Sequence, residues 1–423
     1  MVKKFVLAIL CFATYAVSAQ NGTVSPYSFF GVGDLRNTRT VDNQSMGGLG
    51  MYTDSIHIHL NNPASLGKLG LTAFSAAFSH SEIRLETFSE KQNSSVSTLE
   101  YLAIAMPIRN QRAGIGFGIK PFSDVGYSLQ GESIDDQGAV VTSEFTGEGG
   151  LNKVYFSAGF RVLPNLHVGA TANLIFGNLQ KSRLQITENV LVATLDRRRS
   201  DVSGFDFNYG LTYTPKFGKH TLFTSVRVNT QANITSENEQ DIATLVPETG
   251  RIIEIYEVDL DELNLRNTDI KVPTTTSIGL GYGEDKRWFV GAEYSFQKYS
   301  EFVNTFLEEE NTEYEDASSY VLGGYFVPNF ASIDSYFERV VYRAGVRLDN
   351  TGLVVNDKPL ENFGINFGVG LPVGLGGDFS NLNLGFELGR RGTTANNLVR
   401  ESYFKINIGL AFNSRWFMKR QIN

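Results

Sequence analysis

The feature that most constrains this chain is a strict two-residue alternation of apolar with polar or small side chains. Residues 402–412 show it without a fault, and the apolar positions are Phe404, Ile406, Ile408, Leu410 and Phe412. Successive side chains point to opposite faces of a strand, so this segment has one apolar face and one polar face. In a soluble sheet the apolar face would be the core. In an outer-membrane barrel the apolar face contacts lipid and the polar face lines the lumen.

The alternation recurs along most of the chain, and no long helical period interrupts it. Each copy has about 8–12 residues, the length that a tilted strand needs to cross a bilayer. The predicted strands are roughly 71–81, 98–108, 112–121, 153–162, 166–177, 203–214, 220–228, 272–283, 288–298, 318–326, 340–348, 363–371, 381–388 and 402–412. The sequence therefore predicts an all-β protein.

The connections between these predicted strands alternate in length. Short turns are expected at 110–111, 163–165, 215–219 and 284–287, and long connections at 82–97, 122–152, 178–202, 229–271 and 299–317. An even strand number with short periplasmic turns and long outer loops is typical of a bacterial outer-membrane barrel, whereas a soluble sandwich has no reason to sort its loops in this way. We predict a single transmembrane antiparallel β-barrel of about 14 strands over residues 70–412.

Residues 1–19 have the features of a secretory signal peptide. Lys3 and Lys4 precede the apolar run 5–16, and small residues up to Ala19 form a cleavage site. We expect cleavage near Ala19 and an integral outer-membrane location. Loss of the two lysines takes the net charge from −8 to −10, which argues against nucleic acid as a partner. Cys11, the only cysteine, lies in the apolar run, so the mature chain has no thiol chemistry.

Residues 20–69 precede the first predicted strand and do not alternate well. A segment this long must lie in the periplasm or fold into the lumen. Its small residues Gly47, Gly48 and Gly50 favour close backbone packing, so we predict an N-terminal hatch inside the lumen. Residues 413–423 carry aromatic side chains flanked by cations and are expected to form a C-terminal periplasmic tail.

The segment Asn62-Pro63-Ala64 lies just before the first strand. With the strand count and the closing Trp416 and Phe417, it makes the chain resemble the FadL-like fatty-acid transport barrels. Their branch in Bacteroidota, which includes the PorV-type shuttle proteins of type IX secretion, is the most similar. The resemblance covers essentially the whole mature chain. It implies a barrel plugged by an N-terminal hatch and, in the transporters, sideways release of a hydrophobic ligand through a kink in the third strand.

The third predicted strand contains residues that would weaken its pairing. Pro121 cannot donate a ladder hydrogen bond, and Gly118 and Gly126 weaken the strand on either side of Ser123. We expect a break in pairing, and hence a lateral gap, near Pro121. The alternative is an ordinary strand end with an edge proline.

Five charged residues fall on predicted lumen faces: Glu293, Arg343, Arg347, Glu387 and Lys405. They could join the wall to the plug, or the arginines could hold a ligand carboxylate in a bidentate contact. We favour the first interpretation, because a plugged lumen must neutralise its own charges.

The sequence shows no catalytic constellation. It lacks a phosphate-binding loop, a zinc-type cysteine pair and a Gly-x-Ser-x-Gly elbow, so we predict no enzyme, no cofactor and no metal site. His57 and His59 would share one face of a strand, but a third ligand is not evident, and we interpret them as polar hatch residues. Acidic outer loops near Glu254 and Glu308 lack the spacing of a calcium loop and are interpreted as solvated.

Three functions fit these features. The first is passive lateral diffusion of small hydrophobic, fatty-acid-like molecules into outer-membrane lipid. The second is an accessory barrel that docks outer-membrane or periplasmic proteins within a larger machine, either type IX secretion or outer-membrane protein assembly. The third, an outer-membrane enzyme, is disfavoured by the missing nucleophile motif. The sequence favours the first, although a fold resemblance does not by itself decide function.

Overall fold

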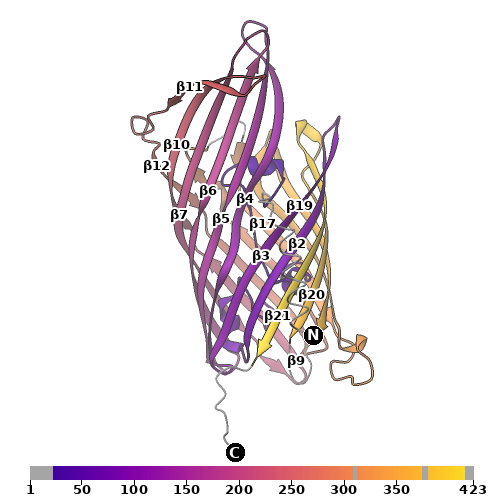
Figure 1. Cartoon of the computed structure of the whole chain (residues 1–423). Coiled ribbons are helices and arrows are strands. Elements are labelled where there is room, and N and C mark those ends of the chain that lie inside the picture. The colour runs from indigo at the N-terminus through magenta and orange to yellow at the C-terminus, as the bar shows by residue number, and fades with distance from the viewer. Residues whose placement is uncertain (1–21, 308–311, 374–379, 415–423) are drawn as a thin grey trace, which may run out of the picture.

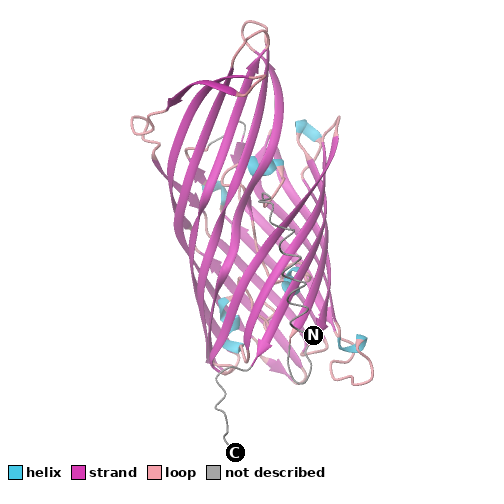
Figure 2. Cartoon of the chain, in the orientation of Figure 1, coloured by secondary structure: helices cyan, strands magenta, loops and turns pink. Residues whose placement is uncertain are grey.

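The computed structural model describes residues 22–307, 312–373 and 380–414. The predicted signal peptide, Glu308 and the predicted tail from Arg415 onward lie outside the described residues. The chain forms one tall barrel with short helical pieces inside it and at its ends (Figures 1 and 2). No helix in the described ranges is long and apolar enough to cross a membrane.

The wall is a closed antiparallel sheet of 14 strands, as predicted. Closure occurs between the first and last strands, from Thr72 opposite Ser414 to Glu86 opposite Arg400. In chain order the wall consists of β2 (Thr72–Glu86), β3 (Lys91–Arg109), β4 (Ala113–Ile134), β5 (Val140–Leu163), β6 (Leu166–Thr187), β7 (Ala193–Tyr213), β9 (His220–Asn229) continued by β10 (Ala232–Val246), β12 (Asn267–Val272) continued by β13 (Thr275–Glu284), β14 (Trp288–Gln297), β17 (Ala317–Phe326), β18 (Val341–Val355), β19 (Lys358–Pro372), β20 (Asn381–Arg391) and β21 (Arg400–Ser414).

Shorter elements lie in the lumen and at the two ends of the barrel. The N-terminal segment contains η1 (Pro26–Phe29), β1 (Asp34–Leu35), α2 (Val41–Gln44) and η2 (Pro63–Lys68). The remaining short elements are β8 (Lys216–Phe217), β11 (Arg251–Glu257), η3 (Tyr299–Glu301), β15 (Val303–Asn304), β16 (Thr312–Tyr314), η4 (Phe337–Arg339) and η5 (Ala395–Asn397).

The predicted alternation separates a lipid face from a lumen face. On β21, Phe404, Ile408 and Phe412 are exposed on the outside, whereas Asn407 and Asn413 are buried on the inside. The other wall strands repeat this arrangement, so a belt of phenylalanine, leucine, isoleucine and tyrosine surrounds the barrel. An outward apolar band with an inward polar face is what a lipid bilayer requires of a strand that crosses it.

One expectation about the connections was wrong. Most of 82–97, 122–152, 178–202 and 229–271 continues as strand instead of forming loops. β4, β5, β6 and β7 have 22, 24, 22 and 21 residues, about twice what a membrane crossing needs. Above the bilayer the outer face of these strands meets water while the inner face stays packed, so the apolar residues that would face lipid are mostly absent although the backbone ladder persists. In Figure 1 this part of the wall rises well above the rest.

The hatch, residues 22–69 of the described chain, lies inside the barrel. Its contact with the wall depends on glycines that face the lumen. A Cβ added to Gly159 would lie 2.3 Å from the Pro63 carbonyl oxygen, and one added to Gly169 would lie 2.4 Å from the Pro63 carbonyl carbon. The wall sequence therefore leaves space for η2, whose six residues pack against β5 and β6.

Candidate functional site

The barrel wall is incomplete between β3 and β4 in its outer half. The two strands pair only between Leu102 opposite Ile119 and Arg109 opposite Ala113. Beyond this point β3 pairs with β2 alone. Among strands of the wall, the same part of β4 pairs only with β5. We call the space between β3 residues 91–100 and β4 residues 120–134 the wall gap.

Local irregularities on both strands coincide with the start of the wall gap. Glu100 is an extra residue in β3, because Ala77 pairs with Tyr101 and the next residue of β2 pairs with Leu99. Phe122 is likewise extra in β4. Bulges of this kind bend a strand and interrupt its ladder. Pro121, which has no N–H, lies two residues beyond the last β3–β4 pair.

The hatch covers the β4 edge of the wall gap with its own backbone. β1 pairs with β4, placing Asp34 opposite Asp124 and Leu35 opposite Ser123. The N–H of Arg36 donates to the Phe122 carbonyl at 2.8 Å.

The four residues predicted for the gap strand divide between the paired and unpaired parts of β4. Gly118 lies below the gap, opposite Ala103 of β3. Pro121, Ser123 and Gly126 lie on the covered edge, where the N–H of Gly126 donates to the Ser28 hydroxyl at 3.1 Å.

One hatch side chain holds both sides of the wall gap. The Arg36 guanidinium contacts Glu100 of β3 at 3.4 Å and Asp124 of β4 at 3.1 Å. Lys405 of β21 contacts the same Glu100 oxygen at 2.6 Å. Beside this cluster, Arg391 of β20 contacts Asp34 at 2.9 Å. We call Arg36, Glu100 and Asp124 the Arg36 clamp. Sequence reasoning missed it, because a cation in a segment without periodicity carries no sign of its partners.

The lumen next to the covered edge is filled by apolar side chains of the protein itself. Val32 of the hatch is buried in a cluster with Phe122, Val125 and Tyr127 of β4. The cluster continues across the wall to Leu151, Ile175, Leu179, Val202, Ala232, Ile234, Leu260, Ile270, Val272, Tyr299, Phe302, Phe306 and Leu307. This part of the lumen is therefore a packed core.

A cavity of about 370 Å³ remains near the wall gap, and its lining is strongly charged. The charged residues that line it are Asp34, Arg36, Arg39, Glu100, Arg347, Asp349, Glu387, Arg391, Glu401 and Lys405. An apolar ligand in this cavity would separate these groups from water without replacing their hydrogen bonds, which is unfavourable. The cavity is thus poorly suited to a hydrocarbon.

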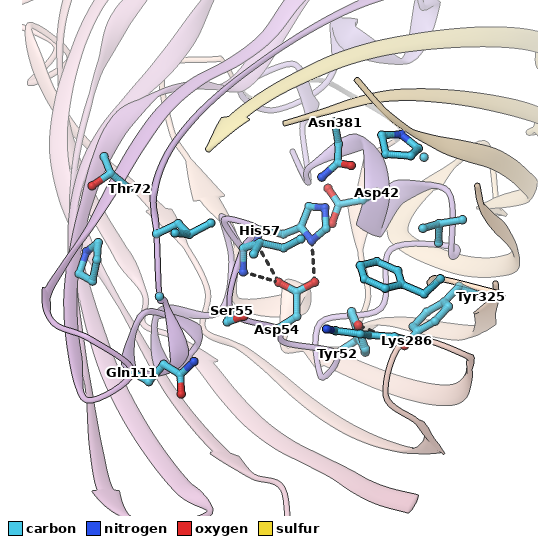
Figure 3. Close-up of a pocket in the computed structure, with 18 of the residues that line it drawn as sticks. Asp42, Tyr52, Asp54, Ser55, His57, Thr72, Gln111, Lys286, Tyr325 and Asn381 are labelled. Atoms are coloured by element: carbon cyan, nitrogen blue, oxygen red, sulfur yellow. Dashed lines mark hydrogen bonds and ion pairs between the residues drawn. The ribbon is translucent and has the colours of Figure 1, made fainter. Parts of the chain in front are cut away.

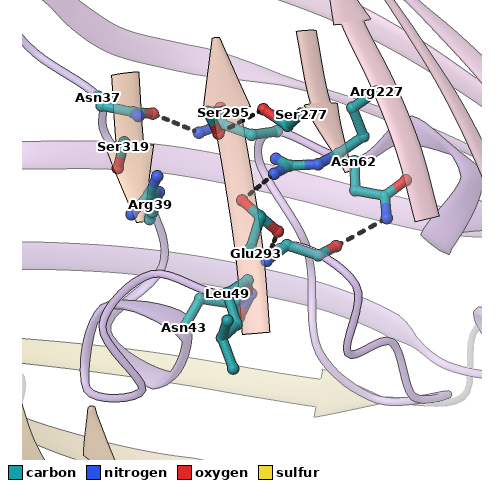
Figure 4. A network of polar contacts seen from close by, with 12 residues as sticks. Asn37, Arg39, Asn43, Leu49, Asn62, Arg227, Ser277, Glu293, Ser295 and Ser319 are labelled. Carbon is teal, nitrogen blue, oxygen red and sulfur yellow. Dashed lines mark hydrogen bonds and ion pairs between the residues drawn. The ribbon is translucent and has the colours of Figure 1, made fainter. Parts of the chain in front are cut away.

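The predicted hatch motif and one of the predicted lumen charges, Glu293, meet at one network (Figure 4). Glu293 of β14 accepts a hydrogen bond from the Gly50 N–H at 2.7 Å and forms an ion pair with Arg227 of β9. Asn62 donates to the Gly50 carbonyl at 2.8 Å and to the Thr212 hydroxyl at 3.1 Å. Its side-chain oxygen accepts from the Ala64 N–H at 3.2 Å, which caps η2 ahead of Pro63.

The other predicted lumen charges also have partners. Glu387 accepts from Gln44 of the hatch at 2.7 Å and from Arg347 at 2.9 Å. Arg343 donates to Asn383 at 3.0 Å. With the Lys405 contact described above, all five residues are engaged by the wall or the hatch. Glu293 and Glu387 thereby attach the plug to the wall, and the other three residues pair with side chains of other wall strands.

The predicted hatch glycines lie where the backbone is tight. Gly47 and Gly48 have φ of +74° and +98°, which disfavours any other residue. A Cβ on Gly50 would lie 2.3 Å from the Arg227 guanidinium carbon. Close packing of this segment therefore requires all three residues.

A larger cavity of about 1210 Å³ opens at the end of the barrel that carries the short turns (Figure 3). Its lining is mostly apolar and includes Met46, Leu71, Ile115, Val327, Phe330 and Val341. His57 also lines it, and its ring Nδ1 lies 2.6 Å from Asp54. Burial alone would lower the pKa of His57, but the Asp54 carboxylate raises it above its usual range.

His59, the other predicted hatch histidine, is buried. Burial, with Arg227 nearby, lowers its pKa to about 3 and keeps the ring neutral. Within the described residues, His57 and His59 belong to no group that could hold a metal ion.

Comparisons with known proteins agree with this architecture. A family model described as BamG matches residues 1–423. The toluene transporter TodX of Pseudomonas putida superposes with a TM-score of 0.57 and 15% identity, over 92% of this chain and 100% of that one. The monoaromatic hydrocarbon channel CymD gives a TM-score of 0.55 and 14% identity, over 90% and 99% of the two chains. At these identities the likeness shows the fold, a FadL-type barrel. No curated protein matches the chain.

Proposed function

The chain belongs to the BamG family, and from this premise we propose that it is an accessory barrel of an outer-membrane machine for protein assembly. In this function the barrel is a rigid, membrane-anchored platform whose exposed surfaces bind other proteins. In this function the packed outer part of the lumen holds the hatch and the wall together. The sequence predicts this function as the alternative to passive transport. The packed and charged lumen favours the accessory barrel over transport.

The observation that carries the proposal is the sealed wall gap. β1 pairs with the β4 edge, the Arg36 clamp joins both edges, and the neighbouring lumen is a packed core. Lateral release of a hydrophobic molecule needs a continuous apolar path to this gap. The residues at the gap supply backbone hydrogen bonds and ion pairs instead.

The family name supports the same function. Bam is the lettered series used for subunits of the outer-membrane β-barrel assembly machinery. Assembly is therefore a better proposal for the partner machine than type IX secretion, the other possibility considered from the sequence. The resemblance to the branch in Bacteroidota stays a prediction.

The test is purification of the tagged chain from its own outer membrane in mild detergent, followed by mass spectrometry and by depletion of the chain in cells. We expect stoichiometric recovery with the assembly barrel, and a loss of several unrelated outer-membrane barrels on depletion. Recovery of the chain alone, with unchanged levels of other barrels, would contradict the proposal.

The second candidate function is passage of small hydrophobic molecules, which the FadL-type fold and the 1210 Å³ cavity favour. It requires the hatch to leave the wall gap. Replacing Pro121 with Val would then favour pairing across the gap and reduce uptake of a labelled fatty acid or toluene. Bound lipid in the purified protein, together with this loss of uptake, would favour transport over the accessory-barrel function.

A further inference from the structure

We propose that the outer edge of β11 is a docking site for an extended, basic segment of another protein, which adds to the sheet as a further strand. This inference deepens the proposed function by naming a surface and a partner chemistry. It rests on that function only for the identity of the machine that supplies the partner.

The strands that rise above the bilayer form a sheet with two open edges. Its order is β4, β5, β6, β7, β10 and β11, and among the described strands β11 pairs with β10 alone. The opposite edge is the end of β4, residues 128–134, which pairs only with β5. In Figure 1, β11 lies near the upper end of the barrel.

The side chains on the two open edges differ. All seven residues of β11 are exposed, and its large apolar residues Ile252, Ile253, Ile255 and Tyr256 are 41%, 55%, 51% and 63% exposed. They occur on both faces of the strand, so neither face is turned toward a core. The β4 edge is more polar, with Gln130, Gly131 and Glu132 at its centre and a single large exposed apolar side chain, Ile134, at its end. Edge strands are usually protected by polar residues, and an apolar one in water indicates a binding surface.

The charge around β11 indicates what kind of segment it binds. Residues 246–262 contain six acidic side chains and one arginine. Two of the acids, Glu254 and Glu257, lie on β11 itself. An added strand would satisfy the free backbone groups. Glu254 and Glu257 lie on opposite faces of β11, so each face of the added strand needs basic side chains to meet a glutamate and apolar side chains to cover the isoleucines and Tyr256. The same negative charge disfavours an anionic lipid.

A second copy of the chain fits this edge less well. Antiparallel pairing of two β11 strands that sets Arg251 opposite Glu257 also sets Glu254 opposite Glu254. Like charges directly opposite each other destabilise a strand pair. The partner is therefore a different chain.

The test uses the detergent-purified full barrel and a fluorescent peptide of Lys-Lys-Val-Val repeats, which carries lysine and valine on both faces of a strand, with binding followed by anisotropy. We expect saturable binding that weakens at least tenfold in the double variant Glu254→Lys with Glu257→Lys. A matched control, Glu132→Lys with Glu144→Lys, makes the same charge change near the opposite edge and should change binding less than twofold. A peptide of Glu-Glu-Val-Val repeats should not bind.

Two outcomes would overturn the inference. If a lysine–valine peptide methylated on alternate backbone nitrogens binds equally well, the contact is electrostatic and no strand is added. If the purified barrel dimerises and the Glu254→Lys change alters the dimer, the occupant is a second copy. If the β11 double variant still purifies stoichiometrically with the assembly barrel, β11 is not the docking site, and the proposed function is unaffected.

Discussion

Removal of the Arg36 guanidinium should release the hatch from the wall gap. Arg36, Glu100 and Asp124 have side chains only 17%, 10% and 14% exposed, so their charges are poorly solvated. In Arg36→Met, Glu100 keeps its contact with Lys405 at 2.6 Å. Asp124 loses the only ion pair found for it among the described residues. Removal of one partner from a buried ion pair costs about 3–5 kcal/mol. Because only the Asp124 carboxylate is left without a cation, we take ~3 kcal/mol for the closed hatch, which corresponds to roughly a hundredfold shift toward the open hatch.

The assay is the rate of maleimide labelling at a single cysteine placed at Ser123, which is fully buried and pairs with Leu35 of β1. The only natural cysteine, Cys11, lies in the predicted signal peptide. We expect Arg36→Met to raise the labelling rate by about two orders of magnitude, because labelling follows the fraction of open hatch.

Two further variants test the reasoning. Arg36→Met combined with Asp124→Asn removes both charges, and the labelling rate should return most of the way to that of the parent. Arg199→Met breaks an ion pair with Asp201 whose side chains are 50% and 52% exposed, and it should change nothing. An unchanged rate in Arg36→Met, or no rescue in the double variant, would refute the clamp.

Three other changes should alter the hatch. Asn62→Ala removes the contacts of a fully buried amide and should lower the free energy of unfolding by ~2–3 kcal/mol, measured by urea titration in lipid vesicles. Gly169→Val should push the hatch off the wall and raise small-solute leakage in liposome swelling, whereas Gly131→Val, which has open space, should not. The ion pair of His57 and Asp54 raises the pKa of the histidine and lowers that of the carboxylate. The pair therefore stabilises the fold fully between pH 3.8 and pH 6.5, the ordinary pKa values of the two groups. This stabilisation should fade as pH rises through the raised pKa of His57, so the melting temperature should fall above that point in the parent and stay level in His57→Gln.

The sequence by itself determined the wall of this protein. Alternation with a period of two is a local property, because each side chain of a crossing strand faces either lipid or lumen. Phe404, Ile408 and Phe412 could be assigned to the lipid face from their spacing alone. The same locality explains the error in the outer connections, since strands such as β11 stand in water and show no such alternation.

Only the tertiary structure decided how the lumen is closed. Asp34, Arg36 and Glu100 lie in two segments without any shared pattern, and they come together because β1 pairs with β4 next to a bulge in β3. Gly159 and Gly169 could be identified as lumen-facing, but their purpose depends on Pro63, which is about a hundred residues away in the sequence. Contacts of this kind depend on which residues the closed barrel brings together. The alternation of side chains along the chain does not say which distant segments will be neighbours in space.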